Sequence, residues 1–316
     1  MKKLVSIVAP MYNEEKLVHV YCEETLKVLS QLSDRYDFEL VLVNDGSKDN
    51  TYSIMLSEQA GHADVITTVC LSRNFGLEGA VNAGLKKAAG DAVVVMDADL
   101  QDPPAIIPEM IAKWEQGADV VVGSRAKRSS DGLVKKSSAS LYYKVLNSYS
   151  GRLKLEKDAA NFRLLSRKAV DQILSLHEAN QVFRVAVPFV GMKTEVVYYD
   201  RDKRYAGKTK YGLKSMIPYA LDSITGISVE PLRKITIFLP ITLLLFIGAI
   251  VGIFLAPPEW AVACFVIMIA CLLTGFILIS LAVMAEYIAQ IMIEAKGRPM
   301  SIIYEYEPCK NVKERQ

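Results

Sequence analysis

Residues 92–104 read AVVVMDADLQDPP, an apolar run that ends in a cluster of acidic residues. The run is apolar on both faces and rich in valine, which is typical of a strand buried in a parallel sheet. In a continuing strand, the side chains of Asp97 and Asp99 would lie on the same face. Two carboxylates so placed repel each other, and a hard divalent cation would satisfy both. The stretch therefore predicts a metal site after a buried strand. For Asp102, metal ligation and a cap on the following, proline-initiated helix stay equally open.

The same pattern recurs on both sides of this stretch. Four further apolar runs are predicted as buried strands: 4–9, 38–43, 65–71 and 118–123. The segments between the runs have helical spacing: 14–32, 49–61, 77–89 and 104–116. Strands that alternate with helices predict an α/β fold, with a mostly parallel sheet that carries helices on both faces.

Polar residues follow two of the other predicted strands. Pro10-Met11-Tyr12-Asn13-Glu14 comes after the first strand, and Asn44-Asp45-Gly46-Ser47 comes after the second. By itself, each segment could be an ordinary turn with a helix cap. Ligands of parallel sheets, however, bind beyond the carboxyl ends of the strands. We therefore expect both segments to converge with the acidic cluster in one site.

The composition excludes several classes of protein. The 316 residues carry 37 Lys and Arg against 35 Asp and Glu, and a net charge of +2 gives no support for nucleic-acid binding. The five Cys are scattered without a C-x-x-C pair, which argues against a disulfide framework and against a zinc site. Hydrophobic residues make up 51% of the chain, and their excess is concentrated towards the C-terminus.

Two long apolar stretches, 235–255 and 261–285, account for this excess. Each reaches the ~20 residues that a helix needs to cross a bilayer, and a short turn joins them, so a transmembrane hairpin is predicted. A pair of buried core helices is the alternative, but such helices are rare in a small soluble domain. Lys and Arg flank the pair and are absent from the turn, which places both termini in the cytoplasm. The expected organisation is an α/β domain over 1–211, an interfacial segment over 212–233, the hairpin within 234–286 and a cytoplasmic tail over 287–316.

Four motifs carry a resemblance to a known family: PMYNE at 10–14, NDGS at 44–47, DADLQDPP at 97–104 and GSR at 123–125. Together they resemble glycosyltransferase family 2, which has the GT-A nucleotide-sugar-binding fold. With the hairpin, the chain is similar to the polyprenyl-phosphate glycosyltransferases, the group of dolichyl-phosphate mannose synthase and the bacterial undecaprenyl-phosphate sugar transferases. The resemblance implies a two-pass enzyme of the cell inner membrane that transfers one sugar, with inversion, from a nucleotide-sugar donor to a polyprenyl phosphate. It also implies Mg²⁺ or Mn²⁺, and similarity to the bacterial members favours UDP over GDP.

The resemblance further implies roles for residues on the donor side. Asp97 and Asp99 would hold the metal ion on the diphosphate. The other residues that would contact the nucleotide sugar near the strand ends are Pro10, Tyr12, Asn13, Glu14, Asp45, Ala98 and Gln101. The family often has Asp where this chain has Asn44, so no contact is assigned to Asn44. The segment 201–211 is similar to the family's R-x-x-G-x-S-K-Y loop, with Thr209 in place of Ser. Its Arg204, Lys208 and Lys210 would close over the pyrophosphate, and a patch that attracts anionic lipid is the alternative.

On the acceptor side, Arg125 ends the fifth predicted strand and offers a guanidinium fork suited to phosphate oxygens. The resemblance places the lipid phosphate here, with Arg128, Lys136 and Ser140 as further contacts. Asp158 would lie near the reacting centre, and an ion pair with Arg163 or a helix cap is equally open. Because a phosphate monoester is largely dianionic at neutral pH, Asp158 is interpreted as an orienting residue before a general base.

Two other functions stay open. Gln181-Val182-Phe183-Arg184 is close to the Q-x-x-R-W signature of processive polysaccharide synthases, but Val185 replaces Trp and two spans leave no room for a polymer channel. A membrane scaffold with an inactive domain would be expected to have lost Asp97 or Asp99, and both are present. The sequence leaves the oligomeric state open, and a homo-oligomer is one of the alternatives.

Overall fold

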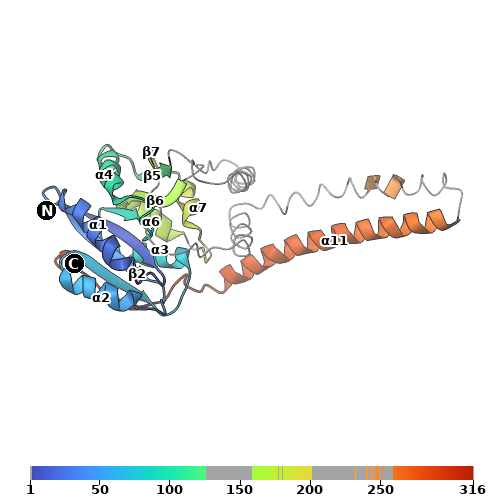
Figure 1. Cartoon of the computed structure of the whole chain (residues 1–316). Helices are drawn as coiled ribbons and strands as arrows, with labels where there is room; N and C mark the ends of the chain where they lie inside the picture. Colours follow the sequence, from blue (N-terminus) through green and yellow to red (C-terminus); the bar gives the residue numbers. More distant parts are fainter. Residues whose placement is uncertain are drawn as a thin grey trace.

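The described part of the chain forms an eight-stranded sheet with helices on both faces, from which one long helix projects (Figure 1). The structure is a computed structural model, and it describes residues 2–125, 159–176, 178–179, 181–200 and 259–315, with isolated positions between 232 and 251. The strand order is β7-β5-β6-β4-β1-β2-β3-β8. Four strand pairs are parallel (β1–β2, β1–β4, β2–β3 and β5–β7) and three are antiparallel (β3–β8, β4–β6 and β5–β6).

All five predicted strands are present: β1 (Lys3–Met11), β2 (Tyr36–Asn44), β3 (Ile66–Leu71), β4 (Ala92–Val95) and β5 (Val120–Arg125). The helices between them are α1 (Val18–Ser30), α2 (Thr51–Gly61), α3 (Leu77–Lys87), the 3₁₀ helix η1 (Pro104–Ile106) and α4 (Ile107–Glu115). β1 pairs in parallel with β2 on one side and with β4 on the other. The chain passes from β1 to β2 on one side, whereas the connection after β3 returns to β4 on the other side of β1, and this reversal creates the switch point where α/β sheets bind ligands.

The second half of the sheet contains an antiparallel strand. β6 (Ala159–Ser166) lies between β4 and β5 and runs antiparallel to both, and β7 (Thr194–Tyr199) pairs in parallel with β5. Helices α6 (Arg167–Ser175) and α7 (Phe183–Val190) connect β6 to β7. Because β6 is antiparallel, its first residue lies at the edge where β5 ends, and Ala159 is paired with Ser124.

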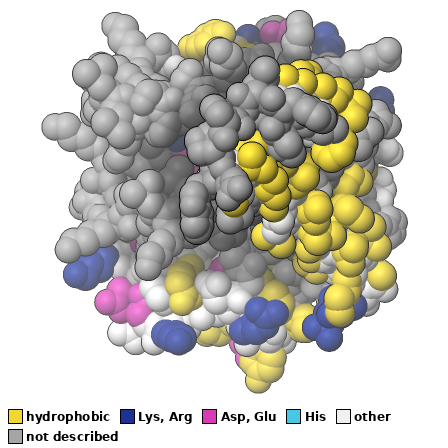
Figure 2. All heavy atoms as spheres, turned by 90° about the vertical axis from the view of Figure 1, so that its right-hand side faces the viewer, with side chains coloured by type: hydrophobic (Ala, Val, Ile, Leu, Met, Phe, Trp, Pro, Cys, Tyr) yellow, Lys and Arg dark blue, Asp and Glu magenta, His cyan; other side chains and the backbone are white. Residues whose placement is uncertain are grey.

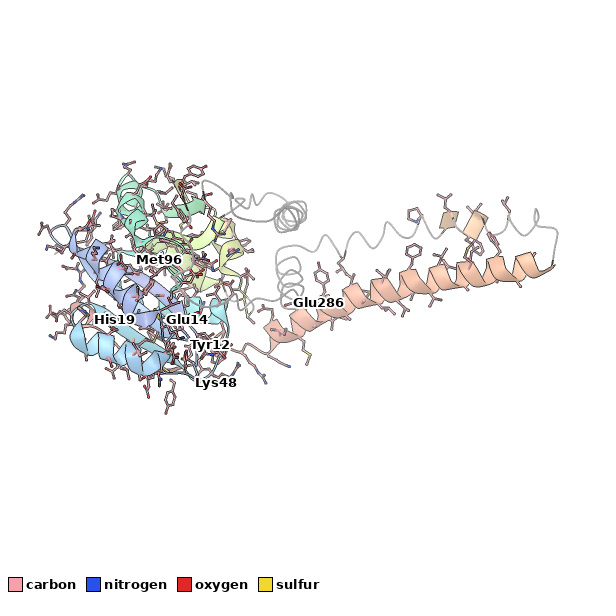
Figure 3. All side chains as sticks on the ribbon, viewed as in Figure 1. Tyr12, Glu14, His19, Lys48, Met96 and Glu286 are labelled. Carbon is pink, nitrogen blue, oxygen red and sulfur yellow. The ribbon has the colours of Figure 1, made fainter. Side chains whose placement is uncertain are left out.

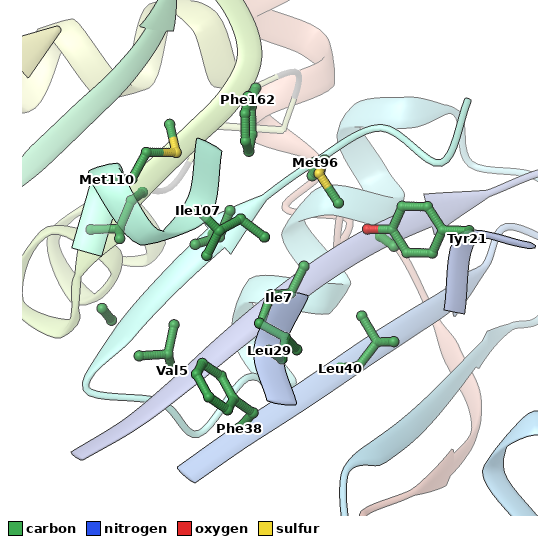
Figure 4. Packing of buried hydrophobic residues seen from close by; sticks show 14 of the residues in the cluster. Val5, Ile7, Tyr21, Leu29, Phe38, Leu40, Met96, Ile107, Met110 and Phe162 are labelled. Carbon is green, nitrogen blue, oxygen red and sulfur yellow. The ribbon is translucent and has the colours of Figure 1, made fainter. Parts of the chain in front are cut away.

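Two hydrophobic clusters hold the helices to the sheet. On one face, side chains of β1, β2 and β4 pack against α1, α2 and α4, with Tyr21, Met96, Ile107 and Phe162 among the buried residues (Figure 4). On the other face, valines of β1, β2, β4 and β5 pack against α3, α6 and α7. The predicted layer of helices on each side of the sheet is confirmed.

One long apolar helix, α11 (Glu259–Ala295), extends away from the sheet (Figure 1). Its segment Met268–Ala295 is long and apolar enough to cross a membrane, judged by length and composition. Large apolar side chains along it are exposed, among them Leu278, Ile288 and Ile291, and Figure 2 shows hydrophobic side chains gathered on the side from which the helix projects. The helix continues ten residues beyond the predicted end of the second span. Most of the first predicted span, 235–255, lies outside the described residues, so the hairpin stays a prediction.

The chain after α11 returns to the sheet, which the sequence did not indicate. β8 (Ile303–Glu307) adds an antiparallel edge strand to β3, and α12 (Lys310–Lys313) follows it. Cys309 and Val312 form a buried cluster with Leu4 of β1. The guanidinium of Arg315 donates to Asp37 at 2.6 Å. The predicted tail is therefore in part a structural element of the α/β domain.

The contact of α3 with the sheet depends on a glycine. A Cβ atom at Gly84 would lie 2.3 Å from Cγ1 of Val8 and 3.1 Å from Cγ2 of Val43. Both valines are fully buried in the central strands, so neither side chain can move away. Gly61, at the end of α2, has open space where its Cβ would be.

We expect Gly84→Ala to lower the free energy of unfolding by about 1–3 kcal/mol, because it overpacks the interface of α3 with β1. Gly61→Ala is the matched control and should be neutral or stabilise by less than about 1 kcal/mol. Thermal unfolding of the two purified variants measures the difference. Equal midpoints for the two variants would contradict the close packing of α3.

Candidate active site

The polar segments predicted to converge lie at one edge of the sheet. Tyr12, Asn13 and Glu14 follow β1, Asp45 follows β2, and Asp97 and Asp99 follow β4. Backbone hydrogen bonds carry the alignment past the strand ends, since Asp45 N donates to Met11 O at 2.9 Å and Met96 N donates to Val8 O at 3.0 Å. Pro10, also predicted for the site, is buried within β1 next to Val43 of β2. Arg125 is the last residue of β5, further along the same edge.

The turns after β1 and β2 bind each other through their side chains. Asn13 has a positive φ of 51°, and its backbone N–H donates to Ser47 Oγ at 3.0 Å. In return, the backbone N–H of Lys48 donates to Asn13 Oδ1 at 2.8 Å. The N–H of Glu14 donates to Thr51 Oγ1 at 2.8 Å. These contacts fix the first turn to the start of α2, with Tyr12, Glu14 and Lys48 on the side of the domain nearer to α11 (Figure 3).

Asp45 holds the loop that follows β3. Its carboxylate is buried and accepts from the N–H of Phe75 at 2.7 Å, the N–H of Gly76 at 3.0 Å and Nδ2 of Asn74 at 3.0 Å. A Cβ at Gly46 would lie 2.3 Å from the carbonyl carbon of Arg73, so the backbone of this turn contacts the loop directly. The structure thus gives Asp45 an organising role for loop 73–76, beside the nucleotide contact that the sequence predicts.

The acidic cluster places two carboxylates, those of Asp97 and Asp99, after β4. Asp97 and Asp99 are both half-buried at the switch point, and Ala98 between them is buried. Leu100 has a positive φ of 53°, and Asp99 Oδ1 accepts from the N–H of Gln101 at 3.2 Å, which orients that carboxylate. Two protein carboxylates with phosphate oxygens and water suit Mg²⁺ or Mn²⁺. Within the described ranges, no group of three or more His, Cys, Asp or Glu could hold a metal ion.

Asp102 is neither a helix cap nor part of the half-buried pair. Pro103 occupies the cap position of η1 without a side-chain hydrogen bond, so the interpretation of Asp102 as a cap is wrong. Asp102 is buried, and its Oδ1 accepts from the hydroxyl of Tyr199 at 2.5 Å. Tyr199, the last residue of β7, is aligned with Arg125 of β5. Its place at the site came from no motif, because β7 was not predicted.

The residues similar to the processive signature bind α7 to the rest of the domain. Gln181 is buried and donates to the carbonyl of Ile173 at 3.0 Å. Arg184 Nε donates to Oδ1 of the buried Asn161 at 2.8 Å. Gln181 and Arg184 therefore make interior contacts that a structural role explains.

Seven predicted site residues lie outside the described residues: Arg128, Lys136, Ser140, Asp158, Arg204, Lys208 and Lys210. Their assignments stay predictions. The described strands next to these segments end or begin at the edge that carries the candidate site: β5 ends there at Arg125, β6 starts there at Ala159 and β7 ends there at Tyr199.

Comparison with known proteins identifies the family. The family model described as Glycosyl transferase family 2 matches residues 6–174. The chain belongs to this family and is a glycosyltransferase, as the sequence motifs predict. It is 39% identical to "Uncharacterized glycosyltransferase YkcC" of Bacillus subtilis (strain 168), over 97% of this chain and 95% of that protein. It is also 39% identical to "Bactoprenol glucosyl transferase" of Shigella phage SfII, over 95% of this chain and 97% of that protein.

A solved structure supports the fold. The chain resembles glucosyl-3-phosphoglycerate synthase from Mycobacterium tuberculosis, crystallised in complex with Mn²⁺, UDP and phosphoglyceric acid, with a TM-score of 0.51. The identity is 20%, over 71% of this chain and 76% of that chain. The predicted GT-A-like α/β fold is confirmed.

The buried Asp45 gives a test of the site that needs no substrate. Burial raises the pKa of Asp45 to about 6, and hydrogen bonds from the loop amides and the charge of Arg73 only partly oppose this. Because the pKa is higher in the folded protein, folding takes up a proton between about pH 4 and pH 6. The contribution of Asp45 to the free energy of unfolding is therefore full below about pH 4 and is lost as the pH rises through about 6.

We expect the thermal midpoint of the wild-type protein to fall, relative to that of Asp45→Asn, as the pH is raised from 4 to 7. The amide of Asn does not titrate, so the variant lacks this part of the pH dependence. Asp171→Asn, an exposed residue of α6, should behave as the wild type. Parallel curves for wild type and Asp45→Asn would show that burial does not perturb this carboxyl group.

Proposed function

We propose that the enzyme transfers one glucosyl residue, with inversion, from UDP-glucose to a polyprenyl phosphate such as undecaprenyl phosphate at the cytoplasmic face of the membrane. The observation that carries the proposal is the meeting of Asp97 and Asp99 with the turns after β1 and β2 at the switch point of a family 2 fold. The choice of glucose and of the lipid is supported by relatives named bactoprenol glucosyl transferase, which are 38–39% identical over most of the chain.

Donor binding is assigned to the turns at the ends of β1, β2 and β4. Pro10, Tyr12, Asn13 and Glu14 form the first turn, which hydrogen bonds to the second turn keep in place. Asp45 holds loop 73–76 next to it. Turns fixed in this way would bind a nucleotide with little further ordering, which favours affinity. Ala98 and Gln101 complete this side, and Arg204, Lys208 and Lys210 are proposed to close over the pyrophosphate.

Asp97 and Asp99 would hold Mg²⁺ or Mn²⁺ on the diphosphate of the donor. The cation, when bound, neutralises negative charge that develops on the leaving diphosphate. The two half-buried carboxylates fit this ion because they supply hard oxygen ligands, and the diphosphate itself would supply the rest.

The acceptor phosphate is assigned to Arg125, with Arg128, Lys136 and Ser140 beside it. A polyprenyl phosphate is largely dianionic at neutral pH, so its oxygen attacks the anomeric carbon without loss of a proton to the protein. The acceptor side has only to fix the phosphate for in-line attack, and positioning supplies much of the rate. Asp158 is proposed to orient the acceptor.

A parity argument supports the proposed membrane topology. β8 comes after α11 and pairs with β3, so the chain on both sides of the region 201–302 belongs to one sheet. If α11 crosses the membrane, the chain must cross an odd number of further times before it. The apolar stretch 235–255 is the segment long enough to do so. A two-pass protein with domain 1–211, interfacial segment 212–233, hairpin 234–286 and a C-terminal part (287–316) on the cytoplasmic side satisfies this condition.

An assay with the purified full-length protein, UDP-glucose, Mg²⁺ or Mn²⁺ and undecaprenyl phosphate tests the function. We expect glucosyl transfer to the lipid, which EDTA abolishes. Asp97→Asn and Asp99→Asn should each lower the rate at least a hundredfold, because the charge that holds the cation is lost. The exposed Asp171→Asn is the matched control and should keep wild-type activity. Transfer that survives EDTA, or near wild-type rates in either site variant, would overturn the metal role, and transfer only from another nucleotide sugar would overturn the choice of donor.

Cysteine labelling in intact cells tests the topology. In a protein whose native cysteines are replaced by serine, Glu259→Cys should react with a membrane-impermeant thiol reagent added from outside. Lys48→Cys and Lys313→Cys, both exposed on the α/β domain, should react only after the cells are opened. Labelling of Lys48→Cys in sealed cells would refute the cytoplasmic placement of the active site.

A further inference from the structure

Three neighbouring side chains lie where β5 and β7 end, on the proposed acceptor side of the site: Arg125, Tyr199 and Asp102. Tyr199 is 4% exposed and Asp102 is 1% exposed, and the hydroxyl of Tyr199 donates to Asp102 Oδ1 at 2.5 Å. Arg125 and Tyr199 face each other across the β5–β7 pair. Burial and then the Asp102 carboxylate raise the pKa of the Tyr199 hydroxyl, and the guanidinium of Arg125, which interacts with that hydroxyl, opposes this in part. Three strand or loop segments far apart in sequence thus meet at one hydroxyl group.

Packing locks the ring of Tyr199 in this position. It meets the ring of Phe162 edge-on, with centroids 5.7 Å apart and an interplanar angle of 82°. Gly123 of β5 lies against the same two rings, and a Cβ at this glycine would be 3.0 Å from Phe162 and 3.1 Å from Tyr199. The hydroxyl therefore has a defined location, set by the sheet and not by the mobility of a surface side chain.

The guanidinium group of Arg125 includes a nitrogen that the described residues do not satisfy. Its Nε is buried and makes no hydrogen bond in the part of the chain that the structure describes. A long arginine side chain at a strand end has many rotamers, and a ligand that binds it must order all of them. A neighbouring hydroxyl that is itself held by a buried carboxylate reduces this freedom before the ligand arrives.

We propose that Tyr199, held by Asp102, is a positioning residue that sets the guanidinium of Arg125 for the phosphate of the acceptor. This inference rests on the proposed function, in which Arg125 binds that phosphate. Asp102 lies in the same loop as Asp97 and Asp99, so the contact also links the donor side of the site to the acceptor side. Tyr199 touches neither substrate in this scheme and acts through Arg125.

Tyr199→Phe tests the proposal because it removes the hydroxyl and keeps the ring against Phe162. With UDP-glucose as donor, we expect the KM for undecaprenyl phosphate to rise about 3- to 10-fold, the effect of one lost hydrogen bond, with kcat and UDP affinity nearly unchanged. Asp102→Asn keeps an oxygen that accepts from Tyr199 and should retain more acceptor affinity than Asp102→Ala. A uniform loss of UDP binding and acceptor use in Tyr199→Phe would mean that the hydroxyl is only structural, and the proposal would be wrong.

The chain offers a matched control at the opposite edge of the sheet. Arg35 Nη2 lies 3.4 Å from the hydroxyl of Tyr36 and 2.8 Å from Oε2 of Glu115, a second group of arginine, tyrosine and carboxylate. Tyr36→Phe removes a hydroxyl of the same kind from the start of β2. It should leave the KM for undecaprenyl phosphate unchanged, and an equal rise in both tyrosine variants would overturn the proposal.

A double-mutant cycle separates this inference from the function on which it rests. In an Arg125→Ala background, Tyr199→Phe should have no further effect on the KM for undecaprenyl phosphate, because the guanidinium that Tyr199 positions is absent. Additive effects would show that Tyr199 acts independently of Arg125 and would refute the inference alone. If Arg125→Ala itself leaves acceptor use intact, then the proposed acceptor site is wrong, whatever Tyr199 does.

Discussion

The parallel pairing of β1 with both β2 and β4 is the constraint on which the candidate site depends. The register of these pairs carries three chain segments to the same edge, so that residues separated by more than 80 positions, such as Asn13 and Asp97, follow neighbouring strands. The pairing survives because each central strand is apolar on both faces and is covered by helices on both. α3 can approach closely only because Gly84 has no side chain to meet Val8. The positions of the candidate site residues at the strand ends thus depend on the packing of the central strands and of α3.

The parts of the fold that the sequence predicted are those with a local signal. The five strands up to Arg125 are short apolar runs between helical segments, and their periodicity is independent of the rest of the chain. β6 was not predicted because two of its buried residues, Asn161 and Arg163, are polar, and each is hydrogen-bonded to a residue of α7. β8 is an edge strand of half-exposed and exposed residues whose partner, β3, lies more than 200 positions earlier. No local sequence pattern predicts a pairing between strands that lie so far apart in the chain.

The residues of the candidate site likewise divide into those with a local sequence signal and those without one. Asp97, Asp99 and the turns after β1 and β2 were found because each follows a recognisable strand directly. Tyr199 carries no signal, since a tyrosine at the end of an unpredicted strand is indistinguishable from any other. The role of Asp102 was open between metal ligation and a helix cap, and its hydrogen bond from Tyr199 could be foreseen from neither. Spacing in the sequence shows which residues could lie at the same edge of the sheet. Only the tertiary structure shows which of their side chains are hydrogen-bonded to other residues of the protein.

Burial separates the structural carboxylates of this domain from those open to a ligand. Glu39, within the central strand β2, is fully buried and accepts from Ser6, Thr67 and the N–H of Ala89. Asp45 likewise accepts three hydrogen bonds from loop 73–76. A buried carboxylate is tolerated only when such donors replace water, and the donors then fix the segments that supply them. Asp97 and Asp99 are only half-buried at the switch point, and they are the carboxylates proposed to hold the cation. The buried acids therefore hold the loops of this domain, and the proposed function assigns the cation to the two that are partly exposed.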